Sequence, residues 1–388
     1  MEENNHKFIG EKYKLFYFDK EIPGQVLFLP KGNTMMVLLE KIIRNIMIEN
    51  QYREIRSGTF GSSTIWCRTK HISKYGENIF QLDNNYMLKP MNCPMHIKIA
   101  SKLYANKSIL PYKLFEINHC YRKEPTGALC GMLRLNRFTQ DDSHTIIEIN
   151  QAKEEIENFI SSVKELYSQF HLNNIKFRLS VIEQKNYIGT EYQKITSENI
   201  LKEVLESNNI EYYTENDGAF YAPKIDVIVK DIYNREWQTG TVQIDMCLLD
   251  NMDFNFQNQH KKENICTIHR AMLGTFERFL AIILENTNGI PNIINPYQLA
   301  VIFINEKESN IQIYEQLINS IINTDTQTVD IIHDKHLKAK ILQQHNLQYV
   351  YKTVIGDNEI KKQVFKIQNN KTKVCKSFNY GEIITLNF

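Results

Sequence analysis

Apolar residues recur at helical spacing in three stretches of the first three-quarters of the chain. Between Met35 and Met47 they fall every three to four positions behind Asn33, which predicts a long amphipathic helix over 34–50 with Asn33 as its cap. Its apolar face is wide enough to serve both a core and a partner subunit. The same spacing predicts helices over 154–170 and 198–205.

Three other stretches are β-branched or alternate between apolar and polar residues. They predict strands over 177–182, 224–232 and 239–246. Helices and strands are mixed without a regular strand–helix–strand rhythm. This order favours the α+β class with an antiparallel sheet.

The periodic pattern stops over 286–296, where Asn, Gly and two prolines dominate. This composition is typical of a linker, so we expect one domain over residues 1–290 and a second over 291–388. The pattern of the second domain predicts a small α/β unit. Its expected elements are strands over 299–304, 328–332 and 348–355 and helices over 308–322 and 337–346.

Composition excludes several classes of protein. With 388 residues and 42% hydrophobic residues, the chain is long and apolar enough to bury real cores. A net charge of +1 argues against a histone-like role. The polar first residues do not resemble a targeting signal, and no apolar run approaches the ~18 residues that span a bilayer. The seven cysteines show no disulfide spacing, which favours a reducing cytoplasm.

One cysteine and two histidines are candidate metal ligands. A thiolate from Cys93 with imidazoles from His144 and His269 is a donor set that zinc prefers, and three protein ligands leave a fourth position open for substrate. The chain has eleven histidines, however, and most histidines in proteins are ordinary core or surface residues. Because the three candidates are far apart in the sequence, metal rules alone do not single them out.

A second set of residues is basic and aromatic. Arg122 and Glu124 precede a turn containing Pro and Gly, Arg134 and Phe138 follow it, and Arg278 lies much later. Guanidinium groups neutralise phosphates, a carboxylate can accept from an amino group, and an aromatic ring can stack on a base. No glycine-rich phosphate loop is present. A nucleotide site in this chain therefore has to be built from arginines.

Six sequence words carry a specific resemblance. They are K-P-M-N-C-P (89–94), R-K-E-P-T-G (122–127), F-T-Q-D-D-S-H (138–144), G-A-F-Y-A-P-K-I (218–225), G-T-V-Q-I-D (240–245) and I-H-R-A-M-L-G-T-F-E-R-F (268–279). In this order they resemble the threonyl-tRNA synthetase family of class II aminoacyl-tRNA synthetases. The match runs from about His6 to the C-terminus. It implies a class II antiparallel-sheet catalytic domain followed by a small α/β anticodon-binding domain.

The resemblance also implies roles for individual residues. One zinc ion per chain would be held by Cys93, His144 and His269. The residues implied for threonine are Gln140, Asp142, Tyr221 and Gln243. Those implied for ATP, which binds with Mg²⁺, are Arg122, Glu124, Arg134, Phe138, Gln238 and Arg278. The residues implied for catalysis are Arg122, Arg278, Lys224 and His71, the last as the base for transfer to tRNA.

The chain departs from the family pattern in three places. The family strand usually reads R-x-R-G-F, whereas here the second basic residue is shifted by one position to Arg137. Whether Arg137 contacts tRNA or ATP is therefore open. The two N-terminal domains of bacterial members, one of which removes serine from mischarged tRNA, are not seen, so the chain resembles reduced, editing-free forms. No arginine follows Arg278, and residues 335–376 hold ten lysines and two acidic residues, a net charge of +8. Lysines suit phosphate contacts, although a merely solvated face is an alternative.

The sequence therefore predicts a cytoplasmic homodimer that activates L-threonine with ATP and transfers it to tRNA(Thr), a threonine–tRNA ligase without membrane contacts. One alternative is a related synthetase that activates threonine for another acceptor, or a non-catalytic RNA-binding relative. Another is a zinc hydrolase. This last alternative requires a general-base carboxylate beside the metal, as in H-E-x-x-H, and the sequence has no such motif.

Overall fold

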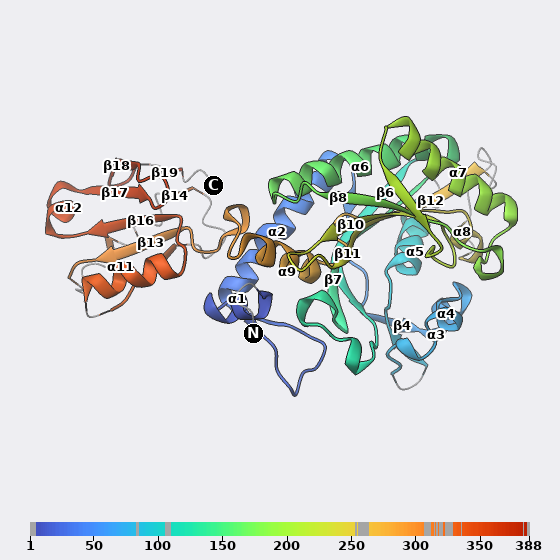
Figure 1. Ribbon diagram of the computed structural model, residues 1–388, viewed down its shortest axis with the longest axis horizontal. Coiled ribbons are helices and arrows are strands. Elements are labelled where there is room, and N and C mark those ends of the chain that lie inside the picture. The colour runs from blue at the N-terminus through green and yellow to red at the C-terminus, as the bar shows by residue number, and fades with distance from the viewer. Residues whose placement is uncertain are drawn as a thin grey trace. The chain divides into compact units, whose positions relative to one another are not determined.

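The computed structural model describes residues 5–82, 85–104, 110–252, 254, 264–305, 312–313, 315, 317, 321–322, 329–334, 336–382 and 384–385 (Figure 1). The chain divides into two compact units. The large unit comprises Phe18–Val26 and Ile42–Asn286. The small unit comprises Met1–Tyr17, Leu27–Lys41 and Thr287–Phe388. The predicted domain boundary between residues 290 and 291 stays a prediction.

An eight-stranded sheet forms the centre of the large unit. Its strand order is β3-β6-β7-β12-β11-β10-β8-β9, and the pairs are antiparallel except for β3 with β6 and β8 with β9. The strands are β3 Arg53–Glu54, β6 Tyr112–Tyr121, β7 Arg137–Glu148, β8 Ile175–Ser180, β9 Tyr212–Glu215, β10 Lys224–Lys230, β11 Glu236–Asp245 and β12 Ile265–Ala271. The predicted α+β class with an antiparallel sheet is confirmed.

Strand β12 lies in the middle of this sheet, and every one of its residues is buried. Successive side chains of a strand point to opposite faces. The side chain of Arg270 therefore meets helix α6 (Ala152–Gln169), where its NH1 lies 3.2 Å from Glu155 Oε1. The neighbouring side chain, that of His269, lines the cavity on the other face. Helices α6 and α7 (Glu191–Ser207) cover the face away from the cavity (Figure 1).

Two predicted helices begin four or more residues earlier in the structure than in the sequence pattern. Helix α7 starts seven residues before the predicted 198, because Thr190 and Gln193 form a capping box ahead of two polar turns. The long helix predicted over 34–50 is α2 (Pro30–Glu49). The predicted cap Asn33 is wrong: this residue lies inside the helix, whose first position is a proline with a fixed, helix-compatible φ.

The remaining elements of the large unit are short. The strands are β4 Phe60–Ser62 and β5 Tyr86–Leu88, and the helices are α3 Ser63–Arg68, α4 His71–Tyr75, α5 Cys93–Tyr104, α8 Leu248–Asn251 and α9 Phe276–Thr287. Single 3-10 turns occur at Gly76–Asn78, Thr126–Ala128, Gly131–Leu133, Ile149–Gln151 and Gln184–Asn186. One core cluster packs α5 and α8 against the sheet and includes Ile97, Leu114, Leu248 and Ile265. This packing fixes the N-terminus of α5, which carries Cys93.

A five-stranded sheet organises the small unit, in the order β15-β13-β16-β17-β18. Strand β13 pairs in parallel with β15 and β16, and the other pairs are antiparallel. Its strands are β13 Leu299–Phe303, β15 Val329–Ile331, β16 Tyr351–Ile355, β17 Val364–Asn369 and β18 Cys375–Asn379. Other described elements are α1 His6–Lys12, β1 Phe16–Tyr17, β2 Leu27–Phe28, a 3-10 turn Asn292–Ile294, α11 Leu337–Asn346, α12 Asp357–Lys362, β14 Ile321–Ile322 and β19 Ile384–Thr385.

Helix α11 has the bounds that the sequence predicts. Most of the predicted helix over 308–322 lies outside the described residues, and its last two residues form strand β14 instead. The core of the small unit includes Leu299, Phe303 and Phe365. None of the helices in the described ranges is long and apolar enough to cross a membrane.

Candidate active site

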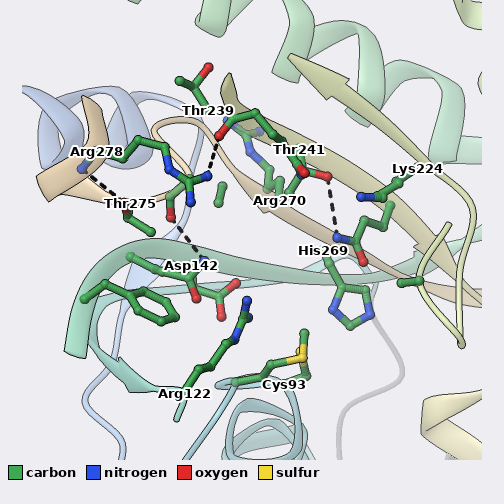
Figure 2. Close-up of a pocket in the computed structure, with 18 of the residues that line it drawn as sticks. Cys93, Arg122, Asp142, Lys224, Thr239, Thr241, His269, Arg270, Thr275 and Arg278 are labelled. Atoms are coloured by element: carbon green, nitrogen blue, oxygen red, sulfur yellow. Dashed lines mark hydrogen bonds between the residues drawn. The ribbon is translucent and has the colours of Figure 1, made fainter. Parts of the chain in front are cut away.

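A cavity of about 550 Å³ opens on the face of the large sheet away from α6 (Figure 2). Strands β7, β10, β11 and β12 form its floor, and the β6–β7 connection, α5 and residues 218–221 form its walls. All the predicted site residues line it except His71 and His144. The residues at one end, called the metal end, are Cys93, Asp142, His144 and His269. Those at the other, called the arginine end, are Arg122, Arg134 and Arg278.

At the metal end the three predicted ligands come together. One ligand atom from each of Cys93, His144 and His269 lies within 4.8 Å of the other two, and all three residues are buried. Strand pairing explains this geometry, because His269 is directly opposite His144 in the β7–β12 register. Cys93 approaches from the first position of α5.

The hydrogen bonds of the two histidines leave one nitrogen of each ring open. His269 Nε2 lies 3.0 Å from Asp245 Oδ2, and His144 Nδ1 lies 2.8 Å from His96 Nδ1. The opposite atoms, His269 Nδ1 and His144 Nε2, are buried and have no hydrogen-bond partner among the described residues. A metal ion needs such unpartnered ring nitrogens. The donor set therefore fits zinc.

Burial shapes the protonation of this end. It raises the pKa of the Cys93 thiol well above its usual value, and the charges of Asp142 and Asp245 add to the effect. It also lowers the pKa of His144 well below its usual value, with the charges of His269 and His96 acting in the same direction. A bound divalent cation favours a thiolate and a neutral imidazole.

Asp142 lies beside the metal end and points into the cavity (Figure 2). Burial raises the pKa of this carboxyl, although Asn92 Nδ2 donates to its Oδ2 at 2.9 Å. Asn92 and Asp245 were not among the predicted site residues. Both lie inside the sequence words quoted above, so the words were a signal, but the contacts depend on the folded structure.

The arginine end is held by main-chain carbonyls and aromatic rings. Arg122 Nε donates to Pro90 O at 3.3 Å, and its Cζ lies 5.4 Å from the Tyr75 ring centre and 5.1 Å from that of Phe138. Arg278 Nε and NH1 donate to the carbonyls of residues 133 and 238 at 2.9 and 2.7 Å. Burial and the charges of Arg122 and Arg134 lower the pKa of Arg278 to about 10. This end is therefore suited to an anionic ligand.

Arg134, just before β7, and Arg137, the first residue of β7, point in different directions. Arg134 is half-exposed and pairs with Glu124, with its NH2 2.8 Å from Glu124 Oε2. Arg137 NH2 instead lies 2.6 Å from His119 Nε2, and Arg137 is not among the cavity-lining residues. Residue 137 precedes Phe138, which lines the cavity, so the alternation of the strand turns Arg137 to the other face.

A buried carboxylate on β10, that of Asp226, orients two of the predicted site residues. Asp226 Oδ2 lies 3.0 Å from Lys224 Nζ and 2.9 Å from Arg178 NH2, and its Oδ1 accepts from Gln238 Nε2 at 2.6 Å. Two predicted site residues, Lys224 and Gln238, are thus oriented by one side chain. Asp226 is fully buried and was not predicted.

His71 is buried beside the cavity at the first position of α4. Its Nδ1 lies 2.7 Å from Thr69 Oγ1, and its Nε2 has no hydrogen-bond partner among the described residues. The rings of Tyr75 and Phe220 flank it. Burial lowers the pKa of His71 to about 3, helped by the charges of His269 and Arg122. The ring is therefore neutral at physiological pH.

The chain matches the tRNA synthetase class II core domain (G, H, P, S and T) over residues 78–287. This match covers more than half of its length, and the chain therefore belongs to the class II tRNA synthetase family.

Within this class, several of the similar proteins are named as threonine enzymes. The threonine–tRNA ligase of Prochlorococcus marinus (strain MIT 9211) is 33% identical over 99% of the chain. The crystal structure of the RNA binding domain of threonyl-tRNA synthetase from Cryptosporidium parvum superimposes with a TM-score of 0.87 at 29% identity, covering 97% of this chain and 96% of that one. A putative threonyl-tRNA synthetase from Aeropyrum pernix shares the fold, with a TM-score of 0.78 at 23% identity over 98% of this chain and 92% of that one. The resemblance predicted from the six sequence words is confirmed.

The chain spans about three-fifths of the length of the curated relatives it matches. The Prochlorococcus ligase is covered over 61% of its length, and that of Psychrobacter arcticus, 30% identical over 99% of this chain, over 60%.

Proposed function

We propose that the chain activates L-threonine with ATP and transfers it to tRNA(Thr). The observation that carries this proposal is the pairing, in one cavity, of a Cys-His-His cluster beside Asp142 with an end built from three arginines. The first arrangement suits a small amino acid with a hydroxyl group. The second suits the phosphates of ATP. The similarity to threonine–tRNA ligases supports the same assignment.

At the metal end, Cys93 Sγ, His144 Nε2 and His269 Nδ1 would hold one zinc ion. Zinc would supply a Lewis-acid position for the amino and hydroxyl groups of threonine. Asp142 would accept a hydrogen bond from the substrate hydroxyl, and its contact with Asn92 keeps it oriented toward the cavity. Gln140, Tyr221 and Gln243, which also line the cavity, would complete the amino-acid pocket.

Adenylate formation needs no protein nucleophile, because the threonine carboxylate attacks the α-phosphorus of ATP and displaces pyrophosphate. The protein has to align the reactants and to neutralise the charge that grows on the phosphates. Arg122 and Lys224 would contact the reacting carboxylate and α-phosphate, while Arg134 and Arg278 would bind the outer phosphates with Mg²⁺. Burial, followed by the charges of Arg122 and Arg134, lowers the pKa of Arg278, and a bound polyphosphate would offset the repulsion between these charges.

Glu124, Phe138 and Gln238 would seat the adenosine. Phe138 already contacts the Arg122 guanidinium on one face, which leaves the other face for the base. Glu124 is held by Arg134 and by the Asn136 side chain, whose Oδ1 accepts from the Glu124 main-chain N–H at 2.9 Å.

In the transfer step, His71 would accept the proton of the terminal ribose hydroxyl of tRNA, while the hydroxyl oxygen attacks the threonyl carbonyl carbon and AMP leaves. A base has to be unprotonated, and burial keeps this ring neutral. Its unpartnered Nε2 is the atom available for the proton.

The small unit would bind the anticodon region through lysine contacts to phosphates. One lysine of the basic stretch does not contribute, because Lys340 is buried and donates to Phe303 O at 3.0 Å. No arginine follows Arg278, so the small unit has no guanidinium for bidentate base contacts. This observation favours a second candidate function, a synthetase that activates threonine for another acceptor.

One experiment separates these possibilities. Purified protein is assayed for threonine-dependent ATP–pyrophosphate exchange and for aminoacylation of tRNA(Thr). Both activities support the proposal, and exchange without aminoacylation indicates another acceptor. Folded, zinc-containing protein without either activity would show a non-catalytic relative. Valine in place of threonine is the substrate control.

We also infer that the enzyme works as a cytoplasmic homodimer. The prediction came from the wide apolar face over 34–50, whose residues Met35, Leu39 and Ile43 are buried in the chain itself. The supporting observation is a second strip on the other side of the helix, where Val37 and Ile48 are 39% and 62% exposed. Such a face favours association with a second copy. Sedimentation at micromolar concentration should give twice the 45.7 kDa chain mass, and a fully active monomer would contradict the inference.

A further inference from the structure

The two histidines of the metal end are supported differently. His269 Nε2 faces the carboxylate of Asp245 directly, at 3.0 Å. His144 has no carboxylate at its Nδ1 but a second histidine, His96, at 2.8 Å. His96 Nε2 in turn lies 3.1 Å from Glu116 Oε1. Metal-bound histidines usually donate their second N–H to a carboxylate, a carbonyl or water, so an intervening imidazole requires an explanation.

Helix α5 explains the position of His96. This residue lies three positions after Cys93, and side chains at this spacing share one face of a helix. The first turn of α5 therefore carries both Cys93, a candidate metal ligand, and His96, which contacts the candidate ligand His144. The His96 and His144 rings meet edge to face with centroids 4.6 Å apart, and both residues are buried, with exposed fractions of 1% and 2%.

Counting hydrogens gives the direction of the hydrogen bonds. Of two ring nitrogens 2.8 Å apart, one has to donate and the other accept. If His144 Nε2 gives its lone pair to the metal, the single hydrogen of the neutral ring sits on Nδ1 and points to His96 Nδ1. The hydrogen of a neutral His96 is then on Nε2, facing the Glu116 carboxylate. The His144–His96 contact thus has one donor and one acceptor, while His96 Nε2 faces Glu116 Oε1 at 3.1 Å without the full geometry of a hydrogen bond.

Glu116 is firmly fixed at the end of this series. Its Oε2 accepts from the Ser57 N–H at 2.8 Å and from Asn118 Nδ2 at 3.0 Å. Its Oε1 lies 3.2 Å from Lys89 Nζ, and neither Lys89 nor Glu116 is exposed by more than 1%. A carboxylate with so many donors stays ionised and cannot turn away from His96.

We propose that His96 and Glu116 form a buried relay that holds His144 in the tautomer presenting Nε2 to the metal. His96 is in this sense a positioning residue, which touches neither threonine nor ATP. The inference rests on the proposed zinc site, because it concerns how one of its ligands is oriented. It adds that the affinity of the site depends on two buried residues outside the cavity lining.

Zinc affinity, measured by competition with a chromophoric chelator, tests the relay without using enzymatic activity. His96→Leu removes both hydrogen-bonding atoms at similar volume, and we expect zinc affinity to fall about 10- to 100-fold, the usual effect of losing such a partner. His96→Asn places an acceptor oxygen where Nδ1 was, so it should retain part of this affinity. The visible spectrum of the Co²⁺-substituted proteins should change in the same order.

The matched control is His119→Leu. His119 lies on the same strand as Glu116 but contacts Thr139 Oγ1 and Arg137 instead, so zinc affinity should not change. Folded His96→Leu protein with the zinc affinity of the unchanged chain overturns the relay. If His96→Leu does not fold, Glu116→Gln decides in the same way, since the relay requires it to weaken zinc binding.

Failure of the relay and failure of the proposed function give different results. A chain that binds no zinc before any substitution contradicts the proposed metal site. A chain that binds zinc and activates threonine, but whose affinity is indifferent to His96 and Glu116, contradicts only the relay. A purely structural role for His96 is recognised by a lower Tm with unchanged zinc affinity, and this result also overturns the relay.

Discussion

The two ends of the cavity are supported by different parts of the protein. At the metal end, Asp245 and His96 contact the two histidines that are the candidate ligands. At the arginine end, Arg122 and Arg278 rest on main-chain carbonyls and on aromatic rings. A carbonyl fixes a guanidinium without neutralising it, so Arg122 and Arg278 keep their positive charge, whereas Arg134 is paired with the Glu124 carboxylate. The metal end therefore depends on the identity of supporting residues, and the arginine end depends mainly on the course of the backbone.

The largest expected effect is at the metal end. Cys93→Ser and His269→Ala should each lose zinc and threonine-dependent exchange, because three protein ligands are the minimum for a site of this kind. Metal analysis and pyrophosphate exchange measure the two losses. ATP binding at the arginine end should persist, and full zinc content in either variant would contradict the ligand assignment.

Substrate choice provides the next largest effect. A site that needs a hydroxyl group to complete its contacts should reject valine by about 10⁴-fold, whereas serine, which lacks only a methyl group, should be rejected by about 10²-fold. Exchange assays with the three amino acids give both ratios. Equal rejection of serine and valine would show that shape, and not the hydroxyl, is read at the metal end. Incubation of seryl-tRNA(Thr) with the protein tests separately whether this chain hydrolyses it.

Removing one arginine should cost less. We expect Arg122→Ala and Arg278→Ala each to slow pyrophosphate exchange by about 10²- to 10³-fold, the scale of a lost preorganised donor, while zinc content stays unchanged. Arg137→Ala is the control, because this side chain faces His119 and not the cavity. If Arg137→Ala is as damaging as Arg122→Ala, the division between the two faces of β7 is wrong.

The smallest effect concerns the second step alone. His71→Ala should slow transfer to tRNA by about 10²-fold and leave exchange nearly unchanged. Because the pKa of His71 is lowered to about 3, the ring remains an unprotonated base from pH 7 down to pH 5. Single-turnover transfer should therefore not show the roughly 20-fold decrease over this range that an ordinary histidine would cause. Such a decrease, if it disappeared in His71→Ala, would show that the pKa of His71 is not lowered in the working enzyme; transfer unchanged in His71→Ala would contradict His71 as the base.

Much of the fold and site could be predicted from the sequence, for identifiable reasons. Helix α11 and strand β10 have strong local patterns, and the words around Cys93, His144 and His269 are specific to one family. The start of α7 was missed because its first two turns are polar and its signal is the Thr190 cap. The cap assigned to Asn33 failed because Pro30 begins the helix earlier.

The supporting residues could not be predicted in this way. Asp245, Asp226 and His96 act through contacts between separate strands and helices, and these contacts depend on register and packing. The direction of the Arg137 side chain could have been predicted, because successive side chains of a strand point to opposite faces and Phe138 was expected in the site. Counting from Phe138 would have placed it on the far face.

The register in which His144 lies directly opposite His269 also limits how this chain can change during evolution. Loops at the ends of β7 and β12 can gain or lose residues without moving either histidine relative to the other. Loss of a single residue within β12 would instead turn His269 toward α6 and bring the next side chain, an arginine, into the metal end. Substitutions should therefore accumulate in both strands over time, whereas insertions and deletions should be confined to their connections.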